Sequence, residues 1–157
     1  MSQPLNQGQT AAAEDFFQFL FTDEKEMKII GPGGVGKTRL MSAMIDDIMP
    51  RYHSSCALMG IEPLYEDVQM TATTNKAAEV LAIATQRPTS TVQSFLALKP
   101  MEDYQTGAVK LRKTDRWKVH EKKILFVDEY SMTDSALDRL IHEGTHQSKI
   151  VYVGDHC

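Results

Sequence analysis

Residues 31–38, with the sequence GPGGVGKT, constrain this chain most, because they fit the pattern G-x-x-x-x-G-K-[ST] at every fixed position. Glycines let successive backbone N–H groups turn inward and close on a β-phosphate, where side chains would obstruct the approach. Lys37 adds a point charge for the phosphates, and the Thr38 hydroxyl can ligate Mg²⁺. The segment therefore predicts a site for a nucleoside triphosphate and its magnesium ion.

The residues on either side of this loop support the prediction. Residues 27–30 are a short apolar run suited to a buried parallel strand, and residues 39–49 carry apolar side chains at helical spacing. Pro50 is expected to end that helix, whose positive end points at the bound anion. The residues in and beside the loop that are predicted to contact ATP are Gly31, Pro32, Gly33, Gly34, Val35, Gly36, Lys37, Thr38 and Arg39.

Composition places the chain among ordinary globular proteins. Its 157 residues, 42% hydrophobic and 24% charged, leave room for one domain with its own core. No apolar run approaches the roughly 20 residues of a membrane span. The N-terminus also lacks an export signal, so a cytoplasmic protein without a membrane partner is expected. The net charge of -4 alone argues against a nucleic-acid partner, but the charge is unevenly distributed.

A second chemical feature follows the apolar run of residues 124–127, which predicts another buried strand. Asp128 and Glu129 come at its carboxyl end, where open α/β sheets bind their ligands. Alone, the pair is explained equally well as the start of a helix. Together with the loop it predicts a catalytic set of Lys37, Asp128 and Glu129, in which Glu129 deprotonates the attacking water and Thr38 and Asp128 hold the metal. We expect the loop and the pair to lie at the tips of neighbouring strands.

Further strands and helices are expected between these motifs. Residues 67–72 alternate like a strand, and residues 73–84 follow as a helix with Thr74 or Asn75 as its cap. Residues 90–98 are expected to form a short helix, and residues 51–66 a connection. The two strand–turn–helix units predict an α/β fold with a parallel sheet flanked by helices.

Between residues 99 and 123 the pattern changes to turns and alternating apolar residues, which predicts an inserted β-hairpin. Seven of the 17 Lys and Arg residues fall between Lys110 and Lys123, on the face opposite Val109, Leu111 and Trp117. A solvated charged face is one explanation. The arrangement also suits phosphates on one side and packing or base stacking on the other.

Gln9 stands at the beginning of a helix expected over residues 11–21. It can simply be a polar residue at a helix start. Alternatively, its carboxamide could accept from N6 of adenine and donate to N7 at once, which would make it an ATP-binding residue. The residues alone leave both interpretations open.

His142 and His146 fit the zinc-protease pattern H-E-x-x-H, in which both histidines share one helical face. We reject a zinc site here. Gly144 lies between them at the expected helix end, and a strand begins three residues after His146.

The order of the motifs resembles the first RecA-like domain of superfamily-1 DNA helicases, especially the RecD and phage Dda type, over most of the chain. The corresponding segments are residues 5–9 for the adenine-reading Q motif, 31–38 for motif I, 72–81 for motif Ia, 90–96 for motif Ib, 128–132 for motif II and 153–155 for the start of motif III. Thr73 stands where the family usually has Pro, and Gln93 where it usually has His.

This resemblance implies a RecA-like P-loop fold made of residues 1–98 and 124–157, with residues 99–123 as a pin that splits the duplex. It implies an ATP- and Mg²⁺-dependent 5′ to 3′ DNA helicase acting on single-stranded and forked DNA, with replication or recombination proteins as further partners. With the basic hairpin, it predicts these DNA-contacting residues: Thr73, Thr74, Asn75, Lys76, Thr91, Gln93, Ser94, Lys110, Arg112, Trp117 and Lys118.

Motif III would continue past Cys157, and the second RecA-like domain with its arginine finger lies outside this sequence. We therefore expect the chain alone to bind ATP weakly and to hydrolyse it barely. The alternatives are another P-loop ATPase, such as a helicase loader or AAA+ protein, and a non-catalytic DNA-binding module. A small-molecule kinase fits least, because no lid-like arginine cluster follows the loop.

Overall fold

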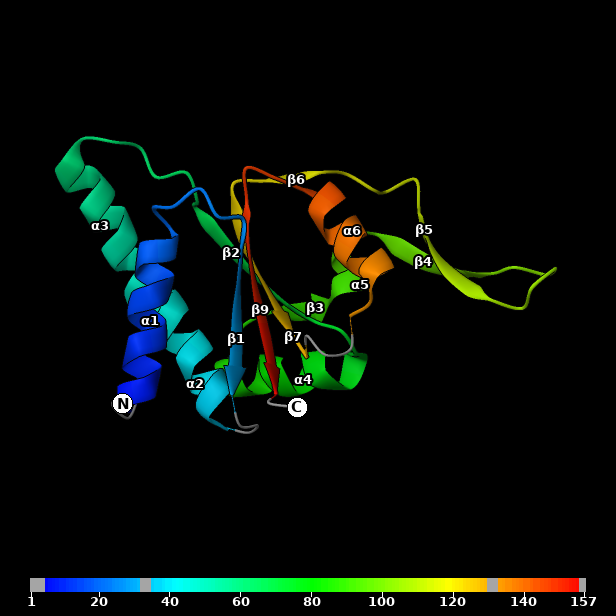
Figure 1. Ribbon diagram of the computed structural model, residues 1–157, viewed down its shortest axis with the longest axis horizontal. Coiled ribbons are helices and arrows are strands. Elements are labelled where there is room, and N and C mark those ends of the chain that lie inside the picture. The colour runs from blue at the N-terminus through cyan, green and yellow to red at the C-terminus, as the bar shows by residue number, and fades with distance from the viewer. Residues whose placement is uncertain (1–4, 32–34, 130–132, 156–157) are drawn as a thin grey trace.

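Five parallel strands lie at the centre of the computed structural model, which describes residues 5–31, 35–129 and 133–155 (Figure 1). Their order across the sheet is β1 (Glu26–Gly31), β9 (Lys149–Asp155), β7 (Lys123–Asp128), β2 (Asp67–Ala72) and β3 (Thr89–Thr91). Helices cover both faces, as Figure 1 shows with α1 to α3 on one side and α5 and α6 on the other. The predicted parallel α/β architecture is confirmed.

The central strand β7 explains why its sequence is continuously apolar. Ile124 and Phe126 pack into one core, with α1 (Gln7–Phe19), α2 (Val35–Ala43) and α3 (Met49–Met59). Leu125 and Val127 point the other way, into a second core with α5 (Val92–Phe95) and α6 (Ser135–Glu143). All four side chains are fully buried, because a parallel strand between two helical layers has no solvent face.

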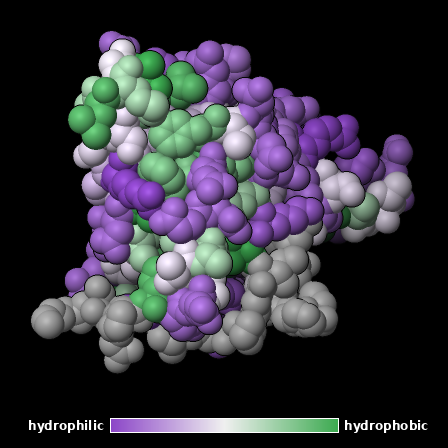
Figure 2. Space-filling model, turned by 60° about the vertical axis from the view of Figure 1, so that its left-hand side comes forward, coloured by the Kyte–Doolittle hydropathy of each residue, from purple (hydrophilic) through white to green (hydrophobic). Residues whose placement is uncertain are grey.

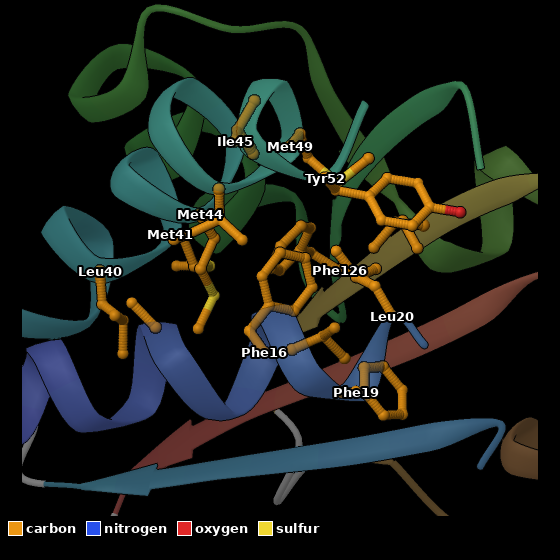
Figure 3. Packing of buried hydrophobic residues seen from close by; sticks show 14 of the residues in the cluster. Phe16, Phe19, Leu20, Leu40, Met41, Met44, Ile45, Met49, Tyr52 and Phe126 are labelled. Atoms are coloured by element: carbon orange, nitrogen blue, oxygen red, sulfur yellow. The ribbon is translucent and has the colours of Figure 1, made fainter. Parts of the chain in front are cut away.

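The larger core forms around two aromatic rings. Phe16 of α1 and Phe126 of β7 lie 5.9 Å apart between ring centroids, and Figure 3 shows Met41, Met44 and Tyr52 closing around them. Burying large apolar side chains of this kind stabilises the fold by about 1.5–3 kcal/mol each. This core attaches the helix that follows the phosphate loop to the sheet.

Pro50 does not end the helix after the loop, contrary to prediction. A five-residue π-helical segment, η1 (Met44–Ile48), separates α2 from α3, and the backbone N–H of Met49 bonds to the carbonyl of Met44. Pro50 then lies in the first turn of α3, where a missing N–H costs nothing. The wider π-turn changes the hydrogen-bond register in front of the proline, so residues 51–59 are helical rather than a connection. The helix finally stops at Gly60, which has a φ of +71°.

Two predicted helices have different bounds in the structure. Asn6 caps α1, so this helix begins at Gln7 instead of residue 11. The short helix predicted for residues 90–98 is limited to α5, because Thr91 ends β3 and caps the helix, and Leu98 already starts the next strand. The helix expected after β2 is confirmed as α4 (Asn75–Thr85), with Thr74 as its cap.

The inserted hairpin is confirmed. Strands β4 (Leu98–Glu102) and β5 (Val109–Lys113) pair antiparallel and extend away from the rest of the molecule (Figure 1). The chain then returns to the body, where β6 (His120–Glu121) pairs with β8 (Thr145–His146). Trp117 therefore lies on the return segment and not on a hairpin strand.

Exposed apolar side chains gather at the end of α3 and in the segment that follows it. Figure 2 shows this apolar surface, which includes Leu58, Met59, Ile61 and Leu64. It lies at the opposite end of the sheet from the carboxyl ends of β1 and β9 (Figure 1). Within the described residues, no helix has both the length and the hydropathy to cross a membrane.

Candidate functional site

The carboxyl edge of the sheet gathers the predicted site residues. β1 ends at Gly31, where the phosphate loop begins, and β7 ends at Asp128. The prediction that these two strands are neighbours is wrong, because β9 lies between them and pairs with both. Every residue from Ile150 to Val153 of β9 is buried, which requires a central position, whereas β1 carries the exposed Lys28 and forms the edge. At the usual strand spacing, β1 and β7 are about 10 Å apart, a span suited to a triphosphate with its metal ion.

The phosphate loop leads into α2 as predicted. Lys37 and Thr38 lie in the first turn of α2, both half-buried, and Arg39 follows them in the same helix. The positive end of α2 therefore faces the loop. Pro32, Gly33 and Gly34 lie outside the described residues, as does the side chain of Val35.

Gln9 contacts the loop helix directly. Its Nε2 donates to the Gly36 carbonyl at 2.9 Å, while its Oε1 accepts from the Asn6 N–H at 2.9 Å. The structure thus shows the capping role, and adds a contact that was not predicted, between the first helix and the start of α2. The contact of Gln9 with adenine stays a prediction.

Asp128 and Glu129 diverge although they are consecutive. Asp128 remains in β7, paired in register with Val153 of β9 on one side and Ala72 of β2 on the other. Glu129 has a φ of +60°, in the left-handed region that non-glycine residues rarely adopt. Its carboxylate Oε2 accepts from the hydroxyl of Thr74 at 3.4 Å and from that of Thr73 at 3.5 Å. The acidic pair is thus at the predicted strand end, and Glu129 is turned toward β2.

The donor set fits a magnesium ion bound together with phosphates. Thr38 offers a hydroxyl and Asp128 a carboxylate, the hard oxygen ligands that Mg²⁺ takes alongside water and substrate phosphates. Among residues 5–31, 35–129 and 133–155, no group of three or more His, Cys, Asp or Glu side chains could hold a metal by itself. His142 and His146 also do not share one helical face, as a zinc site of the H-E-x-x-H type requires. His142 is in the last turn of α6, where its Nε2 lies 3.0 Å from Glu26 Oε2, and His146 is in β8.

The predicted DNA contacts from motifs Ia and Ib lie beside this site, on the other half of the same edge. Thr73 and Thr74 follow β2, Asn75 and Lys76 begin α4 as exposed residues, and β2 pairs with β3 through Ala72 and Thr91. The hydroxyls of Thr74 and Thr91 accept from backbone N–H groups at the starts of α4 and α5, at 3.2 and 3.1 Å. Gln93 and Ser94 lie in α5.

The hairpin presents one cationic face. Lys99 pairs with Arg112 and Met101 with Lys110, and alternation along the strands puts these four side chains on the same side. Sequence reasoning missed Lys99, whose position on this face depends on the register of the hairpin. It also gave no role to Tyr104, which is 98% exposed at the tip.

Trp117 packs against the second core, which is one of the two roles that were open, and its contact with DNA stays a prediction. Its Cη2 atom would lie 3.1 Å from a Cβ placed on Gly144, and the Lys113 ammonium lies 4.6 Å from its ring centroid. Lys113 also pairs with Glu143 of α6 at 3.1 Å, so it faces the body with Leu111 and not the basic face. Lys118, on the return segment, is exposed.

Comparison with known proteins agrees with this geometry. The AAA domain family matches residues 18–157 of the chain. The fold is similar to that of the large terminase from a thermophilic bacteriophage, with a TM-score of 0.51 and 12% sequence identity, covering 97% of this chain and 39% of that chain. At that identity the likeness concerns the P-loop fold alone, and the chain spans well under half of the terminase chain. No curated protein matches the chain in sequence. The match over residues 18–157, which include the phosphate loop and the acidic strand end, shows that the chain belongs to the AAA domain family.

Proposed function

We propose that this chain is the ATP-binding motor domain of an ATP-dependent DNA helicase of superfamily 1, of the RecD and Dda type, moving 5′ to 3′ on single-stranded DNA. One observation supports this most: the nucleotide residues and the predicted DNA residues occupy adjacent halves of one sheet edge. Asp128 of β7 is in register with Ala72 of β2, the residue just before Thr73 and Thr74. A conformational change caused by nucleotide binding or hydrolysis at Asp128 could therefore reach the predicted DNA-binding residues through directly paired strands.

Different residues of the chain are proposed to bind the phosphates, to hold the metal ion and to accept the proton of the attacking water. Lys37 and the backbone N–H groups at the start of α2 would bind the phosphates, and Thr38 and Asp128 would hold the metal. When bound, Mg²⁺-ATP supplies a γ-phosphate that the metal polarises for attack by water. Glu129 would orient that water and accept its proton.

The hairpin is proposed to contact DNA through its cationic face. Lys99, Lys110 and Arg112 project from one side of two paired strands, at a spacing suited to successive phosphates. The aromatic ring of Tyr104, exposed at the tip, is placed where it can stack on a base at a fork. Asp103 holds that tip, since its side chain accepts from the Gln105 N–H at 2.9 Å. In the whole protein, a second RecA-like domain would close on the nucleotide, so the chain alone is proposed to hydrolyse ATP slowly.

Fluorescence anisotropy with a labelled oligo-dT, with and without a non-hydrolysable ATP analogue, tests the proposal. A motor domain changes its DNA affinity when the analogue binds, because both ligands bias one conformational equilibrium. A DNA affinity that is the same with and without the ATP analogue would support the non-catalytic DNA-binding module instead. Binding of nucleotide without DNA would support another kind of P-loop ATPase, such as a helicase loader. The variant Lys37→Ala is the control, because it should abolish the effect of the analogue and leave binding to oligo-dT intact.

A further inference from the structure

The exposed apolar side chains at the end of α3 form a surface that has no part in the proposed function. Its members come from the last turn of α3, from the segment that follows it and from the residues after α1: Phe21, Leu58, Met59, Ile61 and Leu64. Leu58 is 89% exposed, and each of the others is at least 42% exposed. Figure 2 shows apolar residues gathered at this end of the molecule. We call these five residues the α3 surface.

Tyr52 joins the α1 side of this surface to the side that follows α3. Its ring centroid lies 5.2 Å from that of Phe21, and its hydroxyl accepts from the Leu64 N–H at 3.0 Å. Tyr52 itself is buried in the larger core, so the exposed residues beside it stand on a packed base. A large apolar patch of this kind on a folded domain is often a binding site.

The backbone beneath the α3 surface is largely occupied. The N–H of Ile61 donates to the carbonyl of Cys56 at 3.0 Å, and the N–H of Glu66 donates at 3.2 Å to the carbonyl of the residue before β7. The N–H of Leu64 is bonded to Tyr52, as described above, and Pro63 has none. A partner that adds a strand would therefore find few donors. Side chains are what this surface offers, which suits a helix, because its own backbone hydrogen bonds are internal.

Carboxylates surround the α3 surface. Glu62 lies within it, between Ile61 and Leu64 in the chain. Burial raises the pKa of the Tyr65 hydroxyl, and the charge of Asp23 raises it further, which places that carboxylate beside the residue after Leu64. The exposed acidic residues at this end are Asp23, Glu24, Glu62, Glu66 and Asp67. Within the described ranges of the chain, none of these five side chains forms an ion pair.

The cations near these carboxylates do not balance them. Lys149 is buried, and its ammonium donates to two carbonyls of the turn before β1. Arg51 is paired with Glu14 at 2.6 Å. Lys122 is exposed and follows β6, with its carbonyl bonded to the N–H of Glu66. The α3 surface is therefore an apolar patch with a negatively charged rim.

We propose that the α3 surface docks a cationic amphipathic helix of a partner protein. The apolar face of such a helix would cover Leu58 and its neighbours, and lysines or arginines on its flanks would face the carboxylates. The same rim repels the phosphates of nucleic acids and of anionic lipids. The surface lies at the opposite end of the sheet from the carboxyl end of β1 (Figure 1), so docking leaves the nucleotide and DNA residues accessible. The proposal goes beyond the proposed function and does not depend on it.

Fluorescence anisotropy with a labelled peptide of leucine and lysine, arranged to form an amphipathic helix, tests the proposal. DNA is left out, because the peptide would bind it. We expect a dissociation constant of about 10 μM. A peptide with glutamate in place of lysine, and one of the same composition whose leucines do not share one face, should each bind at least about tenfold more weakly. Equal binding of either control peptide would overturn the proposal.

Two matched pairs of variants locate the binding site. Leu58→Asn should weaken binding of the leucine–lysine peptide at least about fivefold, whereas Ile83→Asn, at a position 79% exposed on α4, should leave it unchanged. Glu62→Lys should weaken it at least about threefold. Glu79→Lys, also exposed on α4, changes the net charge equally and should have much less effect. Because these positions are exposed, the variants should keep the circular dichroism spectrum of the natural chain.

Equal losses within either pair would mean that the peptide binds elsewhere or through net charge alone, and would overturn the proposal. Failure of the natural chain to bind the peptide would do the same. Analytical ultracentrifugation tests the other occupant: dimers of the natural chain that Leu58→Asn converts to monomers would show that a second copy covers the surface. These measurements need neither ATP nor oligo-dT, so their failure leaves the proposed function intact, and failure of oligo-dT binding leaves this proposal intact.

Discussion

Gly144→Ala should destabilise the chain and loosen the return segment of the hairpin. An added Cβ would lie 2.6 Å from Leu96 Cδ2 and 3.1 Å from Trp117 Cη2, about 1 Å closer to the former than carbon atoms normally approach. Leu96 is 1% exposed, so its side chain can give way only by displacing its neighbours in the second core. The φ of Gly144 is -85°, so alanine suits the backbone and the cost is steric alone. Overpacking of this kind costs about 1–3 kcal/mol.

Urea unfolding, followed by fluorescence of Trp117 and extrapolated to water, measures this loss. Gly8→Ala is the control, because a Cβ there meets only Asn6 Oδ1, at an ordinary 3.6 Å, within the first turn of α1. That change should leave stability unchanged or raise it by up to about 1 kcal/mol. A loss below about 0.5 kcal/mol for Gly144→Ala, or a similar loss at both glycines, would refute the steric argument.

Three further predictions concern the site and the hairpin. Lys37→Ala should weaken binding of a fluorescent ATP analogue at least about tenfold, with unchanged circular dichroism; retained affinity would contradict the placement of the phosphates. Lys110→Ala should lower affinity for oligo-dT and reduce the slope of log affinity against log salt by about 0.7, whereas an unchanged slope would exclude a phosphate contact. Burial lowers the pKa of His120 below its usual 6.5, so the unfolded chain binds more protons near and below that value. Stability should therefore fall as pH falls from about 7 to 5, and His120→Phe, compared by urea midpoints, should lose part of that dependence; equal pH dependence in both proteins would contradict this.

Several parts of the fold and site follow from short stretches of sequence. The alternation of residues 67–72 predicted β2 with its observed bounds, and the apolar run before Asp128 predicted a strand buried on both faces. The glycine-rich loop predicted the start of a helix, and Thr74 is one of the two caps proposed for α4. Each of these depends on neighbouring residues, because backbone hydrogen bonds and side-chain periodicity act within a few positions.

Other features depend on residues far apart in the chain, and sequence patterns did not reveal them. Pro50 is typical of a helix end, but the π-turn before it and the core around Tyr52 allow the helix to continue. An aromatic residue among basic ones, such as Trp117, is typical of base stacking. In the structure Trp117 packs beside Gly144, because the return segment lies along α6. In both cases tertiary packing outweighs the local preference.

The sequence alone determined the prediction of which side chains carry the chemistry, because a phosphate cradle and an acidic strand end need particular residues at particular spacing. Only the tertiary structure decided how they meet. The burial of β9 puts it between β1 and β7, and the hydroxyls at the end of β2 draw Glu129 to the far side of β7. Strand order and side-chain direction come from which surfaces can be buried together, a property of the whole chain and not of any one segment.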